Sequence, residues 1–409
     1  MNKDRNSDLS TGRSADPDAD RNAGSNAEPS TDLSADRAPD LSADRTTVLD
    51  TDLLHRLLDV DPAAGPVELL HRARGERHLP YLVLAALARE GVRMGAHARD
   101  ELRRARDRVE CYARVARDLA DATGVRPIRD LPLAGYYPPD LPRPLAELGL
   151  VSPTEASLWQ AVNRLVTDHP VESVEVTLLG ERPRHIAVTL RWPAEDPLLD
   201  PWYQVRVATA ALTGDLATVP VRPYLAADDH VECLIALAEE GLGRTFLAGD
   251  VIDVARLAGQ PFEPVETAAV VAAYRLAPEA AALLDLAAEH VPLGALRDVR
   301  TVLEAEVAPE LRRRTSAGAP PSHGTSPRHG TLLRRTVIRH RWDEALLLPA
   351  GDATLLLTPV ADYLLGPEGT RPTDRERTAA LAALRAWDAT LPGSPDGARC
   401  TGLSGPRHR

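Results

Sequence analysis

The feature that most limits which fold this chain can adopt is an apolar stretch followed directly by the start of a helix. Residues 145–151 (LAELGLV) are almost wholly apolar, and Glu147 and Gly149 stand two positions apart within them. Alternate residues of a strand share one face, so these two positions would lie side by side. Ser152 then fits an N-cap with proline after it, and Glu155 completes a capping box. The sequence therefore predicts a strand followed at once by a helix.

A β-hairpin is predicted directly after that helix. Residues 174–178 and 186–192 both alternate apolar and polar side chains, and a segment with glycine and proline separates them. With the preceding strand and helix, the hairpin would form a small mixed-sheet α/β unit over residues 124–195. We expect Glu147 and Thr189 on adjacent strands of this unit, with their side chains on one open face.

Helical patterns flank the predicted sheet on both sides. Residues 47–123 place apolar side chains at helical spacing and include a long Arg-rich helix from about residue 96, and residues 196–315 return to helical patterns. Residues 332–409 predict a small β/α segment with a hairpin and an amphipathic helix. The expected fold class is α+β: a helical N-terminal segment, a small mixed-sheet core and a helical C-terminal half.

Two segments lack the apolar content of a folded element. Residues 1–46 are rich in Asp, Ser, Ala, Asn and Arg, and residues 316–331 consist mainly of Gly, Pro, Ser, Thr and His. Such segments cannot bury enough surface to offset the entropy lost on ordering. We expect the first to be a disordered tail and the second a linker.

The composition argues against several classes of function. A net charge of −12 is unsuited to general DNA binding, which needs a basic surface. No apolar run reaches the length that spans a bilayer, and the first residues lack the apolar centre of a secretory signal. The three cysteines are far apart and form no Cys-x-x-Cys pair, which favours a reducing compartment. We therefore expect a cytoplasmic protein that binds neither DNA nor membranes.

Lysine chemistry is not expected either. Lys3 is the only lysine in the sequence, and it lies in the predicted tail. Schiff-base formation, the phosphate-binding loop of P-loop proteins and the strand lysine of kinases all depend on a lysine amine.

Several polar residues stand at spacings that could bind a metal. Asp250 with Asp253, and His230 with Cys233, are helical i,i+3 pairs, and His78 precedes a proline. Without further ligands, capping or core packing is the simpler interpretation of each.

A run of arginines flanks the predicted linker. Between residues 311 and 342 the sequence contains eight arginines and no acidic residue. This local positive charge could bind an anion or an acidic peptide, or it could be a solvated linker with charged ends.

The order of these patterns resembles the uncharacterised nucleotidyltransferase family, which has a minimal polymerase-β-like core. The likeness spans roughly residues 53–313. It rests on the Ile-Arg-Asp sequence at 128–130, the Tyr-Pro loop, Arg143, the strand with paired acidic positions and the hairpin. Residues 76–82 (ERHLPYL) are similar to an Arg/His-containing helix of the family, and Asp253 lies in a segment similar to its Asp-containing C-terminal helix.

The likeness ends at the positions that carry the family's chemistry. The family's Asp-x-Asp corresponds to Glu147-Leu-Gly149, its third carboxylate to Thr189, and its lysine to Arg129. Magnesium-dependent transfer needs carboxylates that hold the metal ions against the phosphates. Glu147 remains as the one catalytic and metal-binding position, so the resemblance implies a degenerate member. Arg129 and Arg143 could still bind the phosphate of a nucleotide.

The resemblance therefore implies a nucleotidyltransferase-like binding or accessory protein. Members of this family often occur in bacterial gene clusters for peptide natural products, so a substrate peptide or a modifying enzyme is the implied partner. Two alternatives stay open. One is an active magnesium-dependent nucleotidyl- or phosphotransferase that combines Glu147 with Asp130 or Glu175. The other is a helical structural protein without a ligand.

Overall fold

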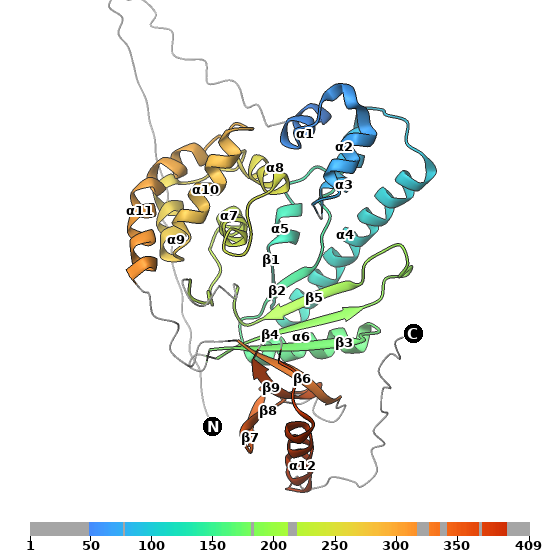
Figure 1. The fold of residues 1–409 in the computed structure, drawn as a ribbon, viewed down its shortest axis with the longest axis vertical. Coiled ribbons are helices and arrows are strands. Elements are labelled where there is room, and N and C mark those ends of the chain that lie inside the picture. Colours follow the sequence, from blue (N-terminus) through green and yellow to red (C-terminus); the bar gives the residue numbers. More distant parts are fainter. Residues whose placement is uncertain are drawn as a thin grey trace, which may run out of the picture. The chain divides into compact units, whose positions relative to one another are not determined.

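The predicted α+β fold is confirmed by a computed structural model. It describes residues 49–76, 78–180, 184–211, 219–316, 327–335, 342–367 and 370–390. Within these ranges, helices surround a single mixed sheet of nine strands (Figure 1). The predicted tail at 1–46 and most of the predicted linker at 316–331 lie outside the described residues.

The helices predicted at both ends of the core are present. The described helices are α1 (Thr51–Leu57), the 3₁₀ helix η1 (Pro62–Ala64), α2 (Gly65–Ala73), α3 (Leu79–Arg89), α4 (Ala96–Thr123), α5 (Asp130–Ala134), α6 (Glu155–Asp168), α7 (Asp229–Glu240), α8 (Ala248–Leu257), α9 (Pro264–Ala273), α10 (Ala277–Ala288), α11 (Leu296–Ser316) and α12 (Asp374–Thr390). The sequence patterns did not predict α5, which lies within the predicted α/β unit. In the described part of the chain, no helix combines the length and the apolar character that crossing a membrane requires.

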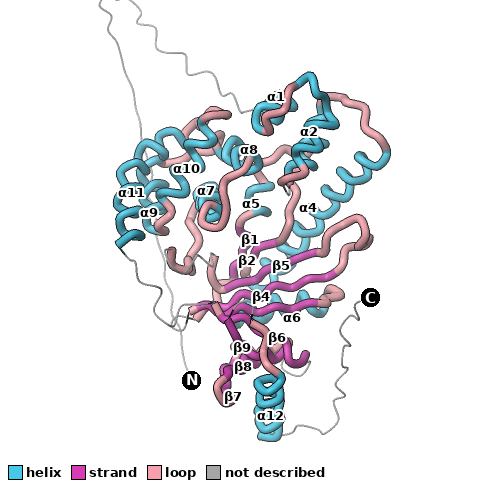
Figure 2. The backbone as a smooth tube through the Cα atoms, in the orientation of Figure 1, coloured by secondary structure: helices cyan, strands magenta, loops and turns pink. Residues whose placement is uncertain are grey.

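The nine strands of the sheet follow the order β1-β2-β5-β4-β3-β6-β9-β8-β7 (Figure 2). Their bounds are β1 (Arg126–Ile128), β2 (Leu148–Val151), β3 (Ser173–Leu179), β4 (His185–Trp192), β5 (Tyr203–Ala208), β6 (Arg328–Arg335), β7 (Leu346–Ala350), β8 (Ala353–Leu357) and β9 (Ala361–Pro367). Strands β2 and β5 are parallel, and the other neighbouring strands are antiparallel. The predicted hairpin is confirmed as β3 and β4.

Strand β5 corrects the expectation that residues 196–315 are wholly helical. Its sequence, YQVRVA, alternates, so Val205 and Val207 are fully buried while the residues between them face the other way. β5 pairs with β2 on one side and with β4 on the other. The prediction that Glu147 and Thr189 lie on adjacent strands was therefore wrong, because β5 separates them.

The C-terminal strands extend the same sheet. β6 pairs with β3 through Thr177 opposite His329 and Leu178 opposite Arg328, so the predicted linker ends before residue 328. The predicted hairpin of this segment is confirmed as β7 and β8. The buried Tyr363 of β9 donates a hydrogen bond from Oη to the carbonyl of Val174 at 3.2 Å, which ties the two parts of the sheet together.

Helix α6 begins two residues later than the capping pattern predicts. The amide of Ser152 donates to the carbonyl of Ala208 at 2.7 Å, so the chain is still bonded to β5 at this residue. Thr154 is the N-cap instead, and its Oγ1 accepts from the amide of Ser157 at 3.1 Å. Glu155 accepts from the indole of Trp159 at 3.1 Å rather than closing a capping box.

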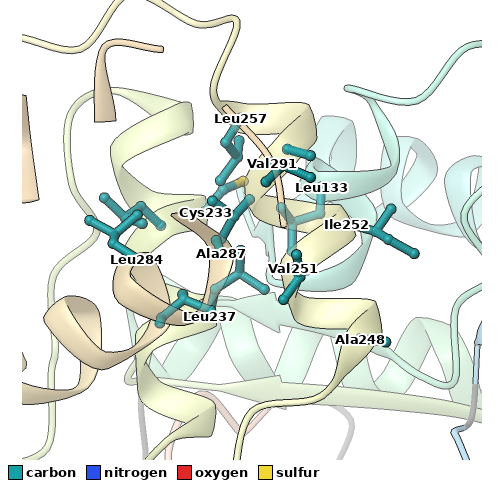
Figure 3. Packing of buried hydrophobic residues seen from close by; sticks show 14 of the residues in the cluster. Leu133, Cys233, Leu237, Ala248, Val251, Ile252, Leu257, Leu284, Ala287 and Val291 are labelled. Carbon is teal, nitrogen blue, oxygen red and sulfur yellow. The ribbon is translucent and has the colours of Figure 1, made fainter. Parts of the chain in front are cut away.

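Two large cores hold most of these elements in place, and a smaller cluster packs α12 against β7, β8 and β9. Helices α4 and α6 cover one face of the sheet, where Trp159 packs in the same cluster as Leu148, Val205 and Val207. The other core joins the N-terminal helices to α7, α8 and α10, and Figure 3 shows its side chains around Cys233. The second face of β5 and β4 carries polar side chains beside Gly149 of β2, and the candidate site lies there.

Candidate functional site

The register of three strands brings Gly149, Arg206 and Thr189 into one row. Gly149 of β2 is the partner of Arg206 of β5, and Arg206 is also the partner of Thr189 of β4. Because Val205 and Val207 point into the α4–α6 core, the side chain of Arg206 lies on the opposite face. A guanidinium therefore stands next to Gly149, where the sequence had predicted Thr189.

A small pocket lies at the Gly149 end of this row. Its cavity volume is about 10 Å³, roughly the room that one water molecule needs, and the rest of the depression is open to solvent. It is lined by Ile128, Arg129, Glu147, Gly149, Leu150, Arg206, Ala208, Ala210 and Ala211. The pocket thus contains Arg129 and Glu147, two of the three residues predicted for the site, together with Arg206, which sequence reasoning missed.

Glycine is sterically favoured at position 149. A Cβ atom built there would lie 3.2 Å from Cγ1 of Ile128, which is closer than side chains normally pack. An aspartate at this position, as the family resemblance would require, could be accommodated only if Ile128 moved.

Arg129 is held in a strained conformation between β1 and α5. Its backbone has φ 63° and ψ −114°, a region that residues with a Cβ rarely adopt. Such conformations cost about 1–3 kcal/mol and often occur where a side chain contacts a ligand. Nη2 of Arg129 lies 3.9 Å from Oε2 of Glu239 and 3.8 Å from Oε1 of Glu240, beyond hydrogen-bond distance, and its buried Nε has no hydrogen-bond partner. Its charge is therefore only partly compensated.

Arg206 is the second cation of the pocket. Among the residues that the structure describes, none forms a hydrogen bond or an ion pair with its side chain. Burial, aided by the positive charge of Arg129, lowers the pKa of the guanidinium, while Glu147 acts in the opposite direction. An arginine remains protonated even so. Arg206 is half-buried, so the pocket contains a partly desolvated positive charge that an anion would stabilise.

Glu147 precedes β2 directly and belongs to a chain of hydrogen bonds along the sheet face. Its Oε2 accepts from Nε2 of Gln204. Oε1 of Gln204 accepts from Nε of Arg191 at 2.8 Å, and Nη1 of Arg191 donates to Oε1 of Glu175 at 2.8 Å. The carboxylates of Glu147 and Glu175 thus lie at opposite ends of this chain rather than together.

Arg143, the third predicted site residue, lies outside the pocket in a buried ion-pair network. Its Nε and Nη2 donate to the two oxygens of Asp253 at 2.7 and 2.9 Å, and Nη1 donates to Asp130 at 2.9 Å. Tyr137 also donates to Asp253, at 2.7 Å. Burial opposes the charge of Arg143, but the two carboxylates hold its pKa above the usual value. A phosphate would have to displace one of these carboxylates, so this geometry favours a structural role.

The donor set around the pocket does not fit magnesium. The family resemblance implies three carboxylate positions. Glu147 occupies the first, Gly149 the second and Thr189, next to Arg206, the third. The carboxylates of the alternative set are bonded elsewhere, Asp130 to Arg143 and Glu175 to Arg191. Two nearby guanidiniums would also repel a divalent cation.

Capping and core packing, the simpler interpretation of the i,i+3 pairs, agree with the contacts of Asp250 and His230. Asp250 accepts from the amide of Leu247 at 2.7 Å and from Arg244, which is capping chemistry. His230 packs edge-on against Phe262. Within the described ranges, no group of three or more His, Cys, Asp or Glu side chains is arranged to hold a metal ion.

The described part of the Arg-rich run is largely paired. Arg314 binds Glu279 and Glu310, and Arg334 binds Asp362 and Asp388. Arg335 donates to backbone carbonyls. These contacts favour packing of the C-terminal segment over a free anion-binding surface, while residues 336–341 lie outside the described residues.

Comparison of the chain with protein-family models, with curated proteins and with solved structures gave no match. The likeness to the uncharacterised nucleotidyltransferase family therefore rests on the sequence pattern alone.

Proposed function

We propose that this chain is a nucleotidyltransferase-like protein that binds a phosphate-bearing ligand without efficient transfer and acts as a binding or accessory protein. One observation carries the proposal. Arg206, a half-buried cation that no described residue pairs, lines the same pocket as the strained Arg129. This pocket lies where the family resemblance implies metal-binding carboxylates.

The chemistry of guanidinium groups supports phosphate as the ligand. Arginine presents several donors in a plane and can bind two phosphate oxygens at once. In a pocket with little water, such charged hydrogen bonds are stronger than at the surface. An enzyme of the resembled family would instead need acidic side chains here, to place magnesium between protein and phosphate.

The partner is implied by the resemblance alone. It suggests a role beside a peptide substrate or a modifying enzyme in the biosynthesis of a peptide natural product. The competing proposal, an active transferase with a rearranged carboxylate set, gains no support from the ion pairs that engage Asp130 and Glu175.

Calorimetric titration of the purified protein with inorganic phosphate tests the proposal. Arg206→Met and Arg129→Met should each weaken binding about 10- to 100-fold, because each removes charged hydrogen bonds worth about 1.5–3 kcal/mol. Arg297→Met is the matched control, since Arg297 is an exposed arginine on α11. The affinity of the Arg297→Met variant for inorganic phosphate should equal that of the wild type.

A transfer assay separates the two proposals. The protein should not consume nucleoside triphosphates, with or without magnesium. Magnesium-dependent turnover that Glu147→Gln abolishes would overturn the proposal in favour of an active transferase.

A further inference from the structure

The Arg129–Arg206 pocket continues onto a polar face of the sheet. In β5, β4 and β3 the apolar residues point into the α4–α6 core, so their neighbours in the strands face the other way. This polar face is formed by Gln204, Arg206, Thr189, Arg191 and Glu175.

Most polar groups of this face are already bonded to one another. Gln204 and Arg191 lie within the hydrogen-bond chain that connects Glu147 to Glu175. Thr189 is different: its hydroxyl, like the guanidinium of Arg206, forms no hydrogen bond with any described residue. Thr189 is half-buried and therefore only partly solvated.

The two unbonded groups are neighbours. Arg206 and Thr189 are cross-strand partners, and such partners have Cβ atoms about 4.5–5.5 Å apart. Unused donors of Arg206 and Thr189 therefore lie on one cross-strand line, and Arg129 lines the pocket at the Arg206 end of it. A ligand on this line would meet two cations and then one neutral hydroxyl.

The charge of the site limits how many phosphates it can bind. A phosphate monoester carries about −1.5 to −2 charges at pH 7. The two guanidiniums, which Glu147, Glu239 and Glu240 partly compensate, cannot neutralise more than one such group. A triphosphate is more negative and normally depends on magnesium for neutralisation. The residues of this pocket do not fit magnesium, and Glu147 would add repulsion.

We propose that the ligand is a phosphate monoester of a hydroxylated molecule, such as a sugar phosphate. Its phosphate binds Arg129 and Arg206, and a hydroxyl group of its organic part binds Thr189. This inference rests on the proposed phosphate-binding function and adds the ligand class and a specificity-determining residue.

Titration with three probes at constant ionic strength tests the inference: inorganic phosphate, ribose 5-phosphate and magnesium-free ATP. Ribose 5-phosphate should bind most tightly. Thr189→Val should weaken its binding about three- to tenfold, the effect of one neutral hydrogen bond, and leave the affinity for inorganic phosphate unchanged. Thr189→Ser should keep the affinity of the wild type. Thr354→Val, at a half-buried threonine on β8, is the control for the substitution itself.

The outcomes separate the two proposals. If phosphate binds through the arginines but ribose 5-phosphate binds no more tightly, the inference fails and the proposed function stands. Equal weakening of both ligands by Thr189→Val, or tighter binding of ATP than of ribose 5-phosphate, would also refute it. If inorganic phosphate itself does not bind, the proposed function fails as well. Valine and threonine have the same shape, so Thr189→Val should fold, and its thermal midpoint reports whether it does.

Discussion

Replacement of Arg143 by methionine should destabilise the protein strongly while leaving phosphate binding intact. The side chain of Arg143 is 7% exposed and that of Asp253 is 5% exposed, so both charges are shielded from water. Methionine keeps most of the volume of arginine but removes all three of its hydrogen bonds. Among the described residues, Asp253 would then retain only the hydroxyl of Tyr137 as a donor.

The expected cost follows from the uncompensated charge. Removing one partner of a buried ion pair typically costs about 3–5 kcal/mol. That is a large fraction of the roughly 5–15 kcal/mol that stabilises a folded domain. Asp130 should contribute less, because its side chain is 23% exposed and water can partly replace its partner.

Urea unfolding followed by circular dichroism measures the loss of unfolding free energy, and a double-mutant cycle shows how much of it comes from the Arg143–Asp253 pair. Arg143→Met, Asp253→Asn and the double variant should show non-additive losses, the double variant losing at least about 1 kcal/mol less than the sum of the two single variants. Additive losses, or a cost below about 1 kcal/mol for Arg143→Met, would refute the structural role. So would weaker phosphate binding in a variant of unchanged stability, since that result would make Arg143 a ligand contact.

Three further substitutions test the surroundings of the pocket. Burial raises the pKa of Glu239 to about 7 although Arg222 lies beside it, so folding favours the protonated form. The stability that this provides is complete below the usual carboxyl pKa of 4.5 and is lost as pH rises through about 7. Glu239→Gln should therefore flatten the decline of the urea midpoint between about pH 5 and 8, and a decline as steep as that of the wild type would contradict the assignment. Gly149→Asp should cost about 1–3 kcal/mol because its Cβ presses on Ile128, and should not create magnesium-dependent turnover; unfolding curves and a transfer assay check both parts. Glu147→Gln should strengthen phosphate binding severalfold by removing a negative charge near Arg206; weaker binding in calorimetry would show that Glu147 assists the ligand.

Local patterns predicted the local elements of the fold. The alternation in residues 174–178 and 186–192 marked the β3–β4 hairpin, and helical spacing marked α4 and α6. The order of strands could not be read in this way, because pairing between β2 and β5 joins segments more than fifty positions apart. The alternation of Val205 and Val207 with Gln204 and Arg206 was a signal for β5. Glutamine and arginine are also common in helices, so this short pattern did not exclude a helix.

The same distinction between local patterns and distant contacts applies to the residues of the candidate site. Arg129 and Glu147 were identified from residue type and order, and both line the pocket. Arg143 was selected by the same reasoning, but its partner Asp253 is 110 positions away, and no local pattern reveals that contact. Arg206 was missed for the converse reason: its position beside Gly149 depends on a sheet register that only the folded chain defines.

The continuation of the sheet from β3 to β6 has a consequence for synthesis of the chain. Thr177 and His329 are hydrogen-bonded neighbours separated by 152 positions, so the outer edge of β3 at Thr177 and Leu178 is paired by residues that leave the ribosome late. Until then β3 presents unpaired backbone groups, and a strand edge in this state readily pairs with another chain. Such distant pairing is also slow to form. A nascent or truncated chain ending near residue 316 would therefore be prone to self-association, and the C-terminal strands would protect the rest of the protein as well as complete its sheet.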